Sequence, residues 1–367
     1  MTKVSVDEVK GELTDKDYQA LMKEFGIDPI DSYLKKLAEK VELAPMYRRG
    51  IVFGHRDFGP IYEAIIHKKQ FAVLTGFNPS GNIHLGNLMF LKQALFFQSL
   101  GADVFIPISN DETYVFRKGN LEDATKNAIE NVIPDIIALG FDEKKTKIFI
   151  STKHPKVYEL AVKLSAKTTI STIKAIFGFN DSTNPGQLFY TIVQAAHILF
   201  PQLEEFDGPK HVVVPIGIDQ DPYMRLVRDI AEKVGLIKPS STYHKFAPGI
   251  FGGKMSGSKP ETCIFLNESP NIAKNKIMKS FSGGAPTLKE HREKGGNPDI
   301  DVAYQYLRFF LEDDDKKLKE LYDGYKSGNI TTGEMKSIAA EKLVAFLKDH
   351  QKKKEKAKDK VDKFLLH

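Results

Sequence analysis

The chain has 367 residues, of which 41% are hydrophobic and 28% are charged. This composition is typical of a folded globular protein, and the length predicts two or three subdomains. No run of about 18 apolar residues occurs, so we expect no membrane-spanning helix. Residues 1–16 are acidic and polar, and we therefore expect no secretory signal.

Charge and cysteine usage narrow the possible functions further. The net charge of +5 is too small to indicate nucleic-acid binding by itself. Lysines gather in residues 350–363, which form either a solvated terminal helix or a surface that faces phosphates. Cys263 is the single cysteine, which excludes an intrachain disulfide and a zinc site built on thiolates; a reducing cytoplasm is the expected location.

The predicted elements fall into three parts along the chain. Residues 14–43 show helical spacing of apolar side chains. From residue 71 onward, short apolar strands alternate with helices. The expected strands are 71–75, 104–108, 147–150 and 211–217, and the expected helices are 84–100, 121–139, 157–166, 189–200 and 221–234. This alternation indicates an α/β fold with a parallel sheet covered on both faces.

The last part of the chain shows only helical patterns. These are residues 272–280, 302–312, 316–327 and 332–349, separated by breaks rich in glycine, serine and asparagine. We therefore place a boundary near Cys263, where the α/β unit gives way to an all-α region.

A glycine-bearing turn joins the first expected strand of the alternation to its helix. It runs through Pro79 and Ser80 to His84, Gly86 and Asn87. In a doubly wound sheet, ligands bind beyond the carboxyl ends of the strands, and a helix start offers N–H groups to phosphate. His84 can donate to a phosphate oxygen, and Gly86 leaves room for an adenine ring. Each residue alone is more often a cap or a turn; their combination predicts a nucleotide site.

A second candidate loop spans Lys254–Ser258 and has the sequence KMSGS. Gly252 and Gly253 precede it and permit movement. Its serines, its backbone N–H groups and the Lys254 charge suit a triphosphate. Such a string is also common in flexible surface loops, but its place after the last expected strand favours a mobile lid over pyrophosphate.

These two motifs resemble the signature sequences of class I aminoacyl-tRNA synthetases. The stretch GIDQDPY at residues 217–223 is similar to the tryptophanyl-tRNA synthetases of the archaeal and eukaryotic branch. Further stretches that agree with this branch are VFGHRD at 52–57, IFGF at 176–179, FSGG at 281–284, GGNPDIDV at 295–302 and FFLEDDD at 309–315. The similarity covers roughly residues 47–365.

The resemblance implies an activity and an architecture. Tryptophan would react with ATP to give tryptophanyl-adenylate and pyrophosphate, and would then be transferred to the terminal adenosine of tRNA, with Mg²⁺ required. The chain would form a homodimer. The expected parts are an N-terminal helical extension (1–60), a Rossmann-type catalytic domain (61–262) with a helical insertion as dimer interface (120–200), and an all-α domain that binds the tRNA anticodon (263–367).

The resemblance also implies roles for individual residues. Those expected to bind ATP are Gly76, Pro79, Ser80, His84, Gly86, Asn87, Lys254, Met255 and Ser256. Those expected to act in catalysis are His84, Lys254, Ser256 and Ser258, the last by supporting the loop. Those expected to bind the amino acid are Leu74, Glu112, Gln194, Asp219 and Gln220.

Four positions depart from the pattern of relatives. Asn87 replaces a histidine of the first signature, and Gly257 replaces a serine of the second. Leu74 stands where many relatives carry a tyrosine, and Pro107 stands where a glutamine would meet the indole N–H. Another group must therefore accept the indole N–H, or leaving it unpaired would cost about 1–3 kcal/mol.

Two other functions share parts of this pattern. Tyrosyl-tRNA synthetases have the same fold and signatures, but Leu74 and the 217–223 stretch disfavour them. An inactive paralogue that binds RNA or acts in regulation is the second alternative, and the two nearly intact signatures count against it.

Overall fold

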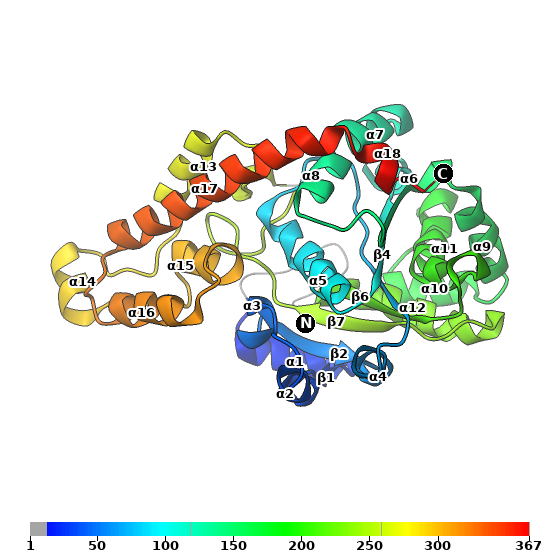
Figure 1. The fold of residues 1–367 in the computed structure, drawn as a ribbon, viewed down its shortest axis with the longest axis horizontal. Coiled ribbons are helices and arrows are strands. Elements are labelled where there is room, and N and C mark those ends of the chain that lie inside the picture. Colours follow the sequence, from blue (N-terminus) through cyan, green and yellow to red (C-terminus); the bar gives the residue numbers. More distant parts are fainter. Residues whose placement is uncertain (1–12, 118, 258, 367) are drawn as a thin grey trace.

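The computed structural model describes residues 13–117, 119–257 and 259–366. Within these ranges, seven strands form one sheet in the order β1-β2-β7-β6-β3-β4-β5 (Figure 1). They are β1 (Asp28–Pro29), β2 (Val52–Arg56), β3 (Phe71–Leu74), β4 (Asp103–Ile108), β5 (Thr146–Ile150), β6 (His211–Gly217) and β7 (Ser240–His244). Strands β7 to β5 are parallel, whereas β1 and β2 pair antiparallel at the β7 edge. The expected α/β fold with a largely parallel sheet is confirmed.

Strand β3 lies in the middle of the parallel part of the sheet. The chain passes from β3 to β4 and β5 on one side and later fills β6 and β7 on the other. Side chains alternate between the faces, so that Phe71 and Val73 belong to one core and Ala72 and Leu74 to the other. All four are buried, because helices cover both faces (Figure 1).

Helices connect and cover these strands. Those up to the end of the sheet are α1 (Asp15–Phe25), α2 (Asp31–Ala38), α3 (Pro45–Arg48), α4 (Gly59–Ile66), α5 (Leu88–Ser99), α6 (Asn110–Arg117), α7 (Leu121–Asn127), α8 (Ile133–Ala138), α9 (Pro155–Ser165), α10 (Ile170–Phe177), α11 (Pro185–Leu199) and α12 (Asp221–Ala231). The helix expected at 84–100 begins with a 3₁₀ turn, η1 (Leu85–Asn87), before α5. The one expected at 121–139 is α7 and α8 joined by the π turn Ala128–Val132.

The N-terminal part is not purely helical. Helices α1 and α2 confirm the pattern seen in residues 14–43, but β1 and β2 extend the sheet within the segment expected as a helical extension. Gly54 of β2 explains why this strand is hard to see in the sequence. A Cβ atom there would lie 2.7 Å from the Ile27 side chain, so close packing requires a residue without strand propensity.

The C-terminal part is all-α, as expected. Its helices are α13 (Pro270–Met278), α14 (Leu288–Lys294), α15 (Val302–Tyr306), α16 (Asp315–Lys326), α17 (Thr332–Lys358) and α18 (Val361–Phe364). Helix α17 runs from this region across to α8 of the α/β part (Figure 1). There the buried Asp135 carboxylate binds Nε2 of His350 at 2.9 Å and Nζ of Lys354 at 2.8 Å. The lysine-rich end therefore has one face fixed against α8, while Lys352 and Lys356 are exposed.

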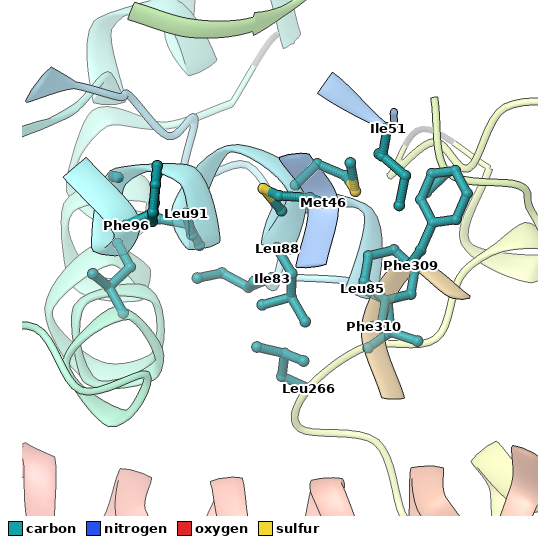
Figure 2. Packing of buried hydrophobic residues seen from close by; sticks show 14 of the residues in the cluster. Met46, Ile51, Ile83, Leu85, Leu88, Leu91, Phe96, Leu266, Phe309 and Phe310 are labelled. Atoms are coloured by element: carbon teal, nitrogen blue, oxygen red, sulfur yellow. The ribbon is translucent and has the colours of Figure 1, made fainter. Parts of the chain in front are cut away.

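One core joins the two parts. Figure 2 shows Ile83, Leu85 and Leu88, which follow β3, in the same cluster as Leu266 and Phe310 from the C-terminal region. The start of α5 is therefore held by packing from both parts of the chain. No helix in the described residues has the length and apolar character needed to cross a membrane.

Candidate active site

A cleft of about 570 Å³ opens at the carboxyl ends of β3 and β6. This is the point where the strand order reverses, which is where doubly wound sheets bind ligands. The structure brings most of the predicted site residues to its walls: Leu74, Gly76, His84, Gly86, Asn87, Glu112, Gln194, Asp219, Gln220, Lys254, Met255 and Ser256.

Two predicted ATP-loop residues are not part of this lining. Pro79 and Ser80 lie in the turn before His84, outside the residues that line the cleft. The Asn78 side chain accepts from Ser80 N–H at 2.9 Å, and the Asn127 amide donates to the Pro79 carbonyl at 3.0 Å. These bonds fix the turn. Ser258 lies outside the described residues.

The two candidate loops meet over the start of α5. The Gly86 N–H points at Sδ of Met255, 3.1 Å away, and a Cβ atom on Gly86 would lie 3.0 Å from the His84 ring. A Cβ atom on Gly257 would come within 3.6 Å of the same ring. The thioether of Met255 thus covers the surface of Gly86 that we expected to receive adenine.

His84 lies between the loops and is buried. Its backbone N–H donates to Oδ1 of Asn87 at 2.9 Å, which fixes the entry into the helix. Burial, and then the charge of Lys254, lowers the pKa of His84 to about 4, so the ring is neutral at pH 7. Its Nδ1 atom is buried without a hydrogen-bond partner in the described part of the chain. A polar atom in that state is available to a ligand.

Lys254 is held at the end of β6. Its Nζ atom lies 2.6 Å from Oδ2 of Asp219 and 4.3 Å from the centre of the Phe246 ring. Gly217 allows this cluster to form, because a Cβ atom there would lie 2.6 Å from Oδ1 of Asp219 and 2.8 Å from the Phe246 ring. The positive charge of the lysine loop is thereby fixed at the mouth of the cleft.

Glu112 on α6 lines another part of the cleft. Its carboxylate accepts from the Tyr190 hydroxyl at 2.9 Å. Burial raises the pKa of Glu112, and the polar side chains of Asn78 and Tyr190 act in the opposite direction. Gln194 lies one turn after Tyr190 on α11, and both line the cleft, as does Gln220 at the start of α12. These residues therefore offer carboxylate and amide groups to a polar ligand.

Between these groups the floor of the cleft is apolar. It includes Leu74 and Pro107. The Pro107 carbonyl already accepts from Phe77 N–H at 2.9 Å. Pro107 has no N–H group, and its ring nitrogen faces the end of β3. On the same side of β4, the Thr75 N–H donates to the Phe105 carbonyl at 3.1 Å. Proline is tolerated here because β3 ends at Leu74.

Asp221, next to the expected amino-acid-binding residues Asp219 and Gln220, has a structural role. Gln220 is the N-cap, and Asp221 is the first residue of α12. Its buried carboxylate binds Arg56 at 2.8 Å and the Tyr243 hydroxyl at 2.5 Å. These bonds tie α12 to β2 and β7.

Among the cleft residues that the sequence reasoning did not identify are Tyr190, His197 and Phe246. His197 follows Gln194 by three positions, so the helical period of α11 could have placed both on one face. Phe246 follows β7, which has no apolar pattern, and no sequence signal marks it.

Known proteins share this fold and cleft. Residues 67–348 match the family described as tRNA synthetases class I (W and Y). The chain is 44% identical over 354 residues to the tryptophan–tRNA ligase of Methanocaldococcus jannaschii, covering 95% of each chain. For the solved tryptophanyl-tRNA synthetase of Aeropyrum pernix the identity is 40%, the TM-score 0.91 and the coverage 96% of this chain and 97% of the other.

A further solved relative is the tryptophanyl-tRNA synthetase of Encephalitozoon cuniculi bound to tryptophan, with 32% identity, a TM-score of 0.86 and coverage of 96% and 98%. The chain therefore belongs to the class I tRNA synthetases of the tryptophan and tyrosine type. Within that family, the relatives just described carry the names of tryptophan enzymes.

Proposed function

We propose that the protein is a tryptophan–tRNA ligase, which activates tryptophan with ATP and transfers it to tRNA. The observation that carries this proposal is the meeting of Met255 with Gly86, which places both candidate signature loops over one cleft at the switch point of the sheet. Names of relatives at 40–44% identity over most of the chain support tryptophan as the amino acid. They do not favour the tyrosyl alternative.

The proposed first step is attack of the tryptophan carboxylate on the α-phosphorus of ATP, in line with the leaving pyrophosphate. A carboxylate is already a nucleophile, so no general base is needed. Catalysis then depends on positioning and on charge stabilisation. Glu112 suits the ammonium group of the amino acid, because its carboxylate is partly buried in the cleft and fixed by Tyr190.

ATP would bind at the loop pair. Gly86 and Asn87 at the helix start would hold the nucleotide, with His84 donating to phosphate, and Lys254 and Ser256 would stabilise the pyrophosphate. In this account Met255 moves off Gly86 when adenine arrives, and Lys254 exchanges the Asp219 carboxylate for phosphate oxygens. Both contacts are on one loop, so a single loop movement can make both changes.

Mg²⁺ enters the proposal only as an ion bound to ATP. In residues 13–117, 119–257 and 259–366, no cluster of three or more histidine, cysteine, aspartate or glutamate side chains could hold a metal ion. The described residues therefore do not fit a resident metal, and no step above passes through one.

The remaining partners and the location are also part of the proposal. Exposed apolar residues of the 120–200 segment, such as Val162 and Ile170 at 61% each, suit a homodimer interface there. The exposed lysines of α17 suit tRNA phosphates. The single cysteine, Cys263, is buried and free, which is compatible with a cytoplasmic protein.

ATP–pyrophosphate exchange with single amino acids tests the proposed activation. We expect exchange with tryptophan and little with tyrosine. Exchange with tyrosine alone would establish the tyrosyl alternative, and the absence of exchange with every amino acid would establish the inactive paralogue.

A further inference from the structure

The apolar floor of the cleft lacks an acceptor for the indole N–H. Neither Leu74 nor the ring of Pro107 can accept a hydrogen bond, although both line the cleft. The indole ring has one polar atom, a donor, which is normally paired when it is buried. A suitable acceptor has to be in the wall of the same cleft.

His197 stands in that wall. It lies on α11 with Tyr190, Gln194 and Ile198, all of which line the cleft. The residue is buried, and its ring packs against the ring of Phe149 with a centroid distance of 5.9 Å. This packing and a hydrogen bond to Ser151 fix the plane of the imidazole ring.

A chain of hydrogen bonds decides which ring nitrogen carries the proton. The Ser151 hydroxyl donates to Oδ2 of Asp111 at 2.8 Å, and the Tyr158 hydroxyl donates to the same oxygen at 2.8 Å. A serine has only one hydroxyl proton. Ser151 Oγ must therefore accept in its 2.8 Å contact with Nε2 of His197, which makes Nε2 the protonated nitrogen.

The other ring nitrogen is then a free acceptor. Burial lowers the pKa of His197 to about 4, with Asp111 acting in the opposite direction, so the ring carries one proton at neutral pH. Nδ1 has no hydrogen-bond partner in residues 13–117, 119–257 and 259–366. His197 lines the cleft, so a ligand bound there lies next to its ring.

We infer that Nδ1 of His197, whose tautomer is set by Ser151 and Asp111, accepts the indole N–H and so selects tryptophan. This rests on the proposed activation of tryptophan. His197 is the specificity-determining residue in this account, and Ser151 and Asp111 are positioning residues that act through its ring.

Two other acceptors compete for the same role. The Thr75 carbonyl faces Pro107, which has no N–H to give it, and Thr75 lines the cleft. The Tyr190 hydroxyl donates to Glu112 and keeps lone pairs. A hydrogen bond from the indole N–H to either group would not depend on the side chain at position 197. Mutation of His197 therefore separates these two acceptors from the one inferred.

The test compares tryptophan with β-(1-benzothiophen-3-yl)-L-alanine, in which sulfur replaces the N–H group. The ratio of kcat/KM values in ATP–pyrophosphate exchange is measured for wild type, His197→Leu, His197→Asn, Ser151→Ala and Tyr190→Phe. Turnover of the sulfur analogue shows that each variant is folded. We expect wild type to prefer tryptophan by about tenfold or more, because the analogue leaves a buried acceptor unpaired.

In His197→Leu the ratio should fall to nearly 1, through loss of activity with tryptophan alone. His197→Asn should keep most of the preference, since asparagine Oδ1 can take the place of Nδ1, and Ser151→Ala should give an intermediate ratio. A preference that survives in His197→Leu would overturn the inference, and loss in Tyr190→Phe alone would assign the acceptor to Tyr190. A wild-type ratio for Ser151→Ala would overturn the tautomer assignment. Failure of wild type to use tryptophan at all would instead refute the proposed function.

Discussion

The Lys254 ammonium lies 2.6 Å from the Asp219 carboxylate, at the carboxyl end of β6. The lysine of one loop is thus paired with a residue of the expected amino-acid pocket. Lys254 also lies over the Phe246 ring. A cation can leave an aromatic ring at little cost in free energy when an anion is available to bind it. In the proposed function, this pair holds the Lys254 charge at the cleft until phosphate oxygens replace the Asp219 carboxylate.

Lys254→Ala should lower the rate of adenylate formation by about 100-fold or more, because the lysine would stabilise charge mainly in the transition state. Tryptophan binding should change little. Single-turnover kinetics and equilibrium binding of tryptophan give the two quantities separately. Equal losses in both would show that the lysine acts in ground-state binding.

Asp219→Asn removes the resting partner of Lys254 while keeping the shape of the side chain. Because Lys254 then no longer has to leave a carboxylate for phosphate, we expect the KM for ATP to fall by about two- to fivefold. Steady-state exchange measurements with ATP varied give this value. A large rise in the KM for tryptophan would mean that Asp219 binds the amino acid directly.

Gln220→Ala should raise the KM for tryptophan by about tenfold or more, since a hydrogen bond to a charged group of the substrate is lost. The KM for ATP should stay close to the wild-type value. Exchange assays with each substrate varied in turn separate the two. An effect confined to ATP would place Gln220 at the nucleotide instead of the amino acid.

Asp135→Asn should destabilise the protein by about 3–5 kcal/mol, because it breaks a buried ionic contact between α8 and α17. Chemical denaturation measures the loss. Lys353→Ala on α17 is a control, since its pair with Asp349 is exposed and should contribute less than about 1 kcal/mol. Similar losses in both variants would contradict the anchoring role of Asp135.

His244 should make the protein less stable in mild acid. Burial, and then the charge of Lys254, lowers its pKa to about 3, against 6.5 for an ordinary histidine. Between these values the unfolded chain binds more protons than the folded one, so stability falls as the pH falls. Between pH 8 and pH 5 this group should contribute a loss of about 2 kcal/mol.

His244→Gln should remove that part of the pH dependence. Denaturation at both pH values gives the difference, and His67→Gln, at an exposed position, controls for the removal of a histidine. An unchanged difference in His244→Gln would show that His244 is not the group that titrates.

The sequence predicted the central sheet well where strands are apolar and poorly where they are not. β3 and β6 are short apolar runs, whereas β7 consists of Ser240, Ser241, Thr242, Tyr243 and His244. Except for Ser241, its polar side chains find hydrogen-bond partners elsewhere along the chain. The Gln93 side chain, for example, accepts from Thr242 at 2.9 Å and contacts Nδ1 of His244 at 3.0 Å. Such pairing is not visible in a local pattern.

The same reason limits what the sequence says about the cleft. The motifs in combination predicted that His84 and Lys254 belong to one site, and both line the same cleft, whereas binding of a nucleotide there stays a prediction. The acceptor role of His197 depends on Ser151 and Asp111, which come from other parts of the chain. A proton position of that kind follows from three-dimensional contacts alone.

Charging of tRNA tests the central claim most directly. The protein is incubated with ATP, Mg²⁺, unmodified or cellular tRNA and either labelled tryptophan or labelled tyrosine, and acid-precipitable label is counted. We predict that tryptophan accumulates on tRNA and tyrosine does not. Label from tyrosine alone, or no label from either amino acid while a reference synthetase charges the same tRNA, would contradict the account.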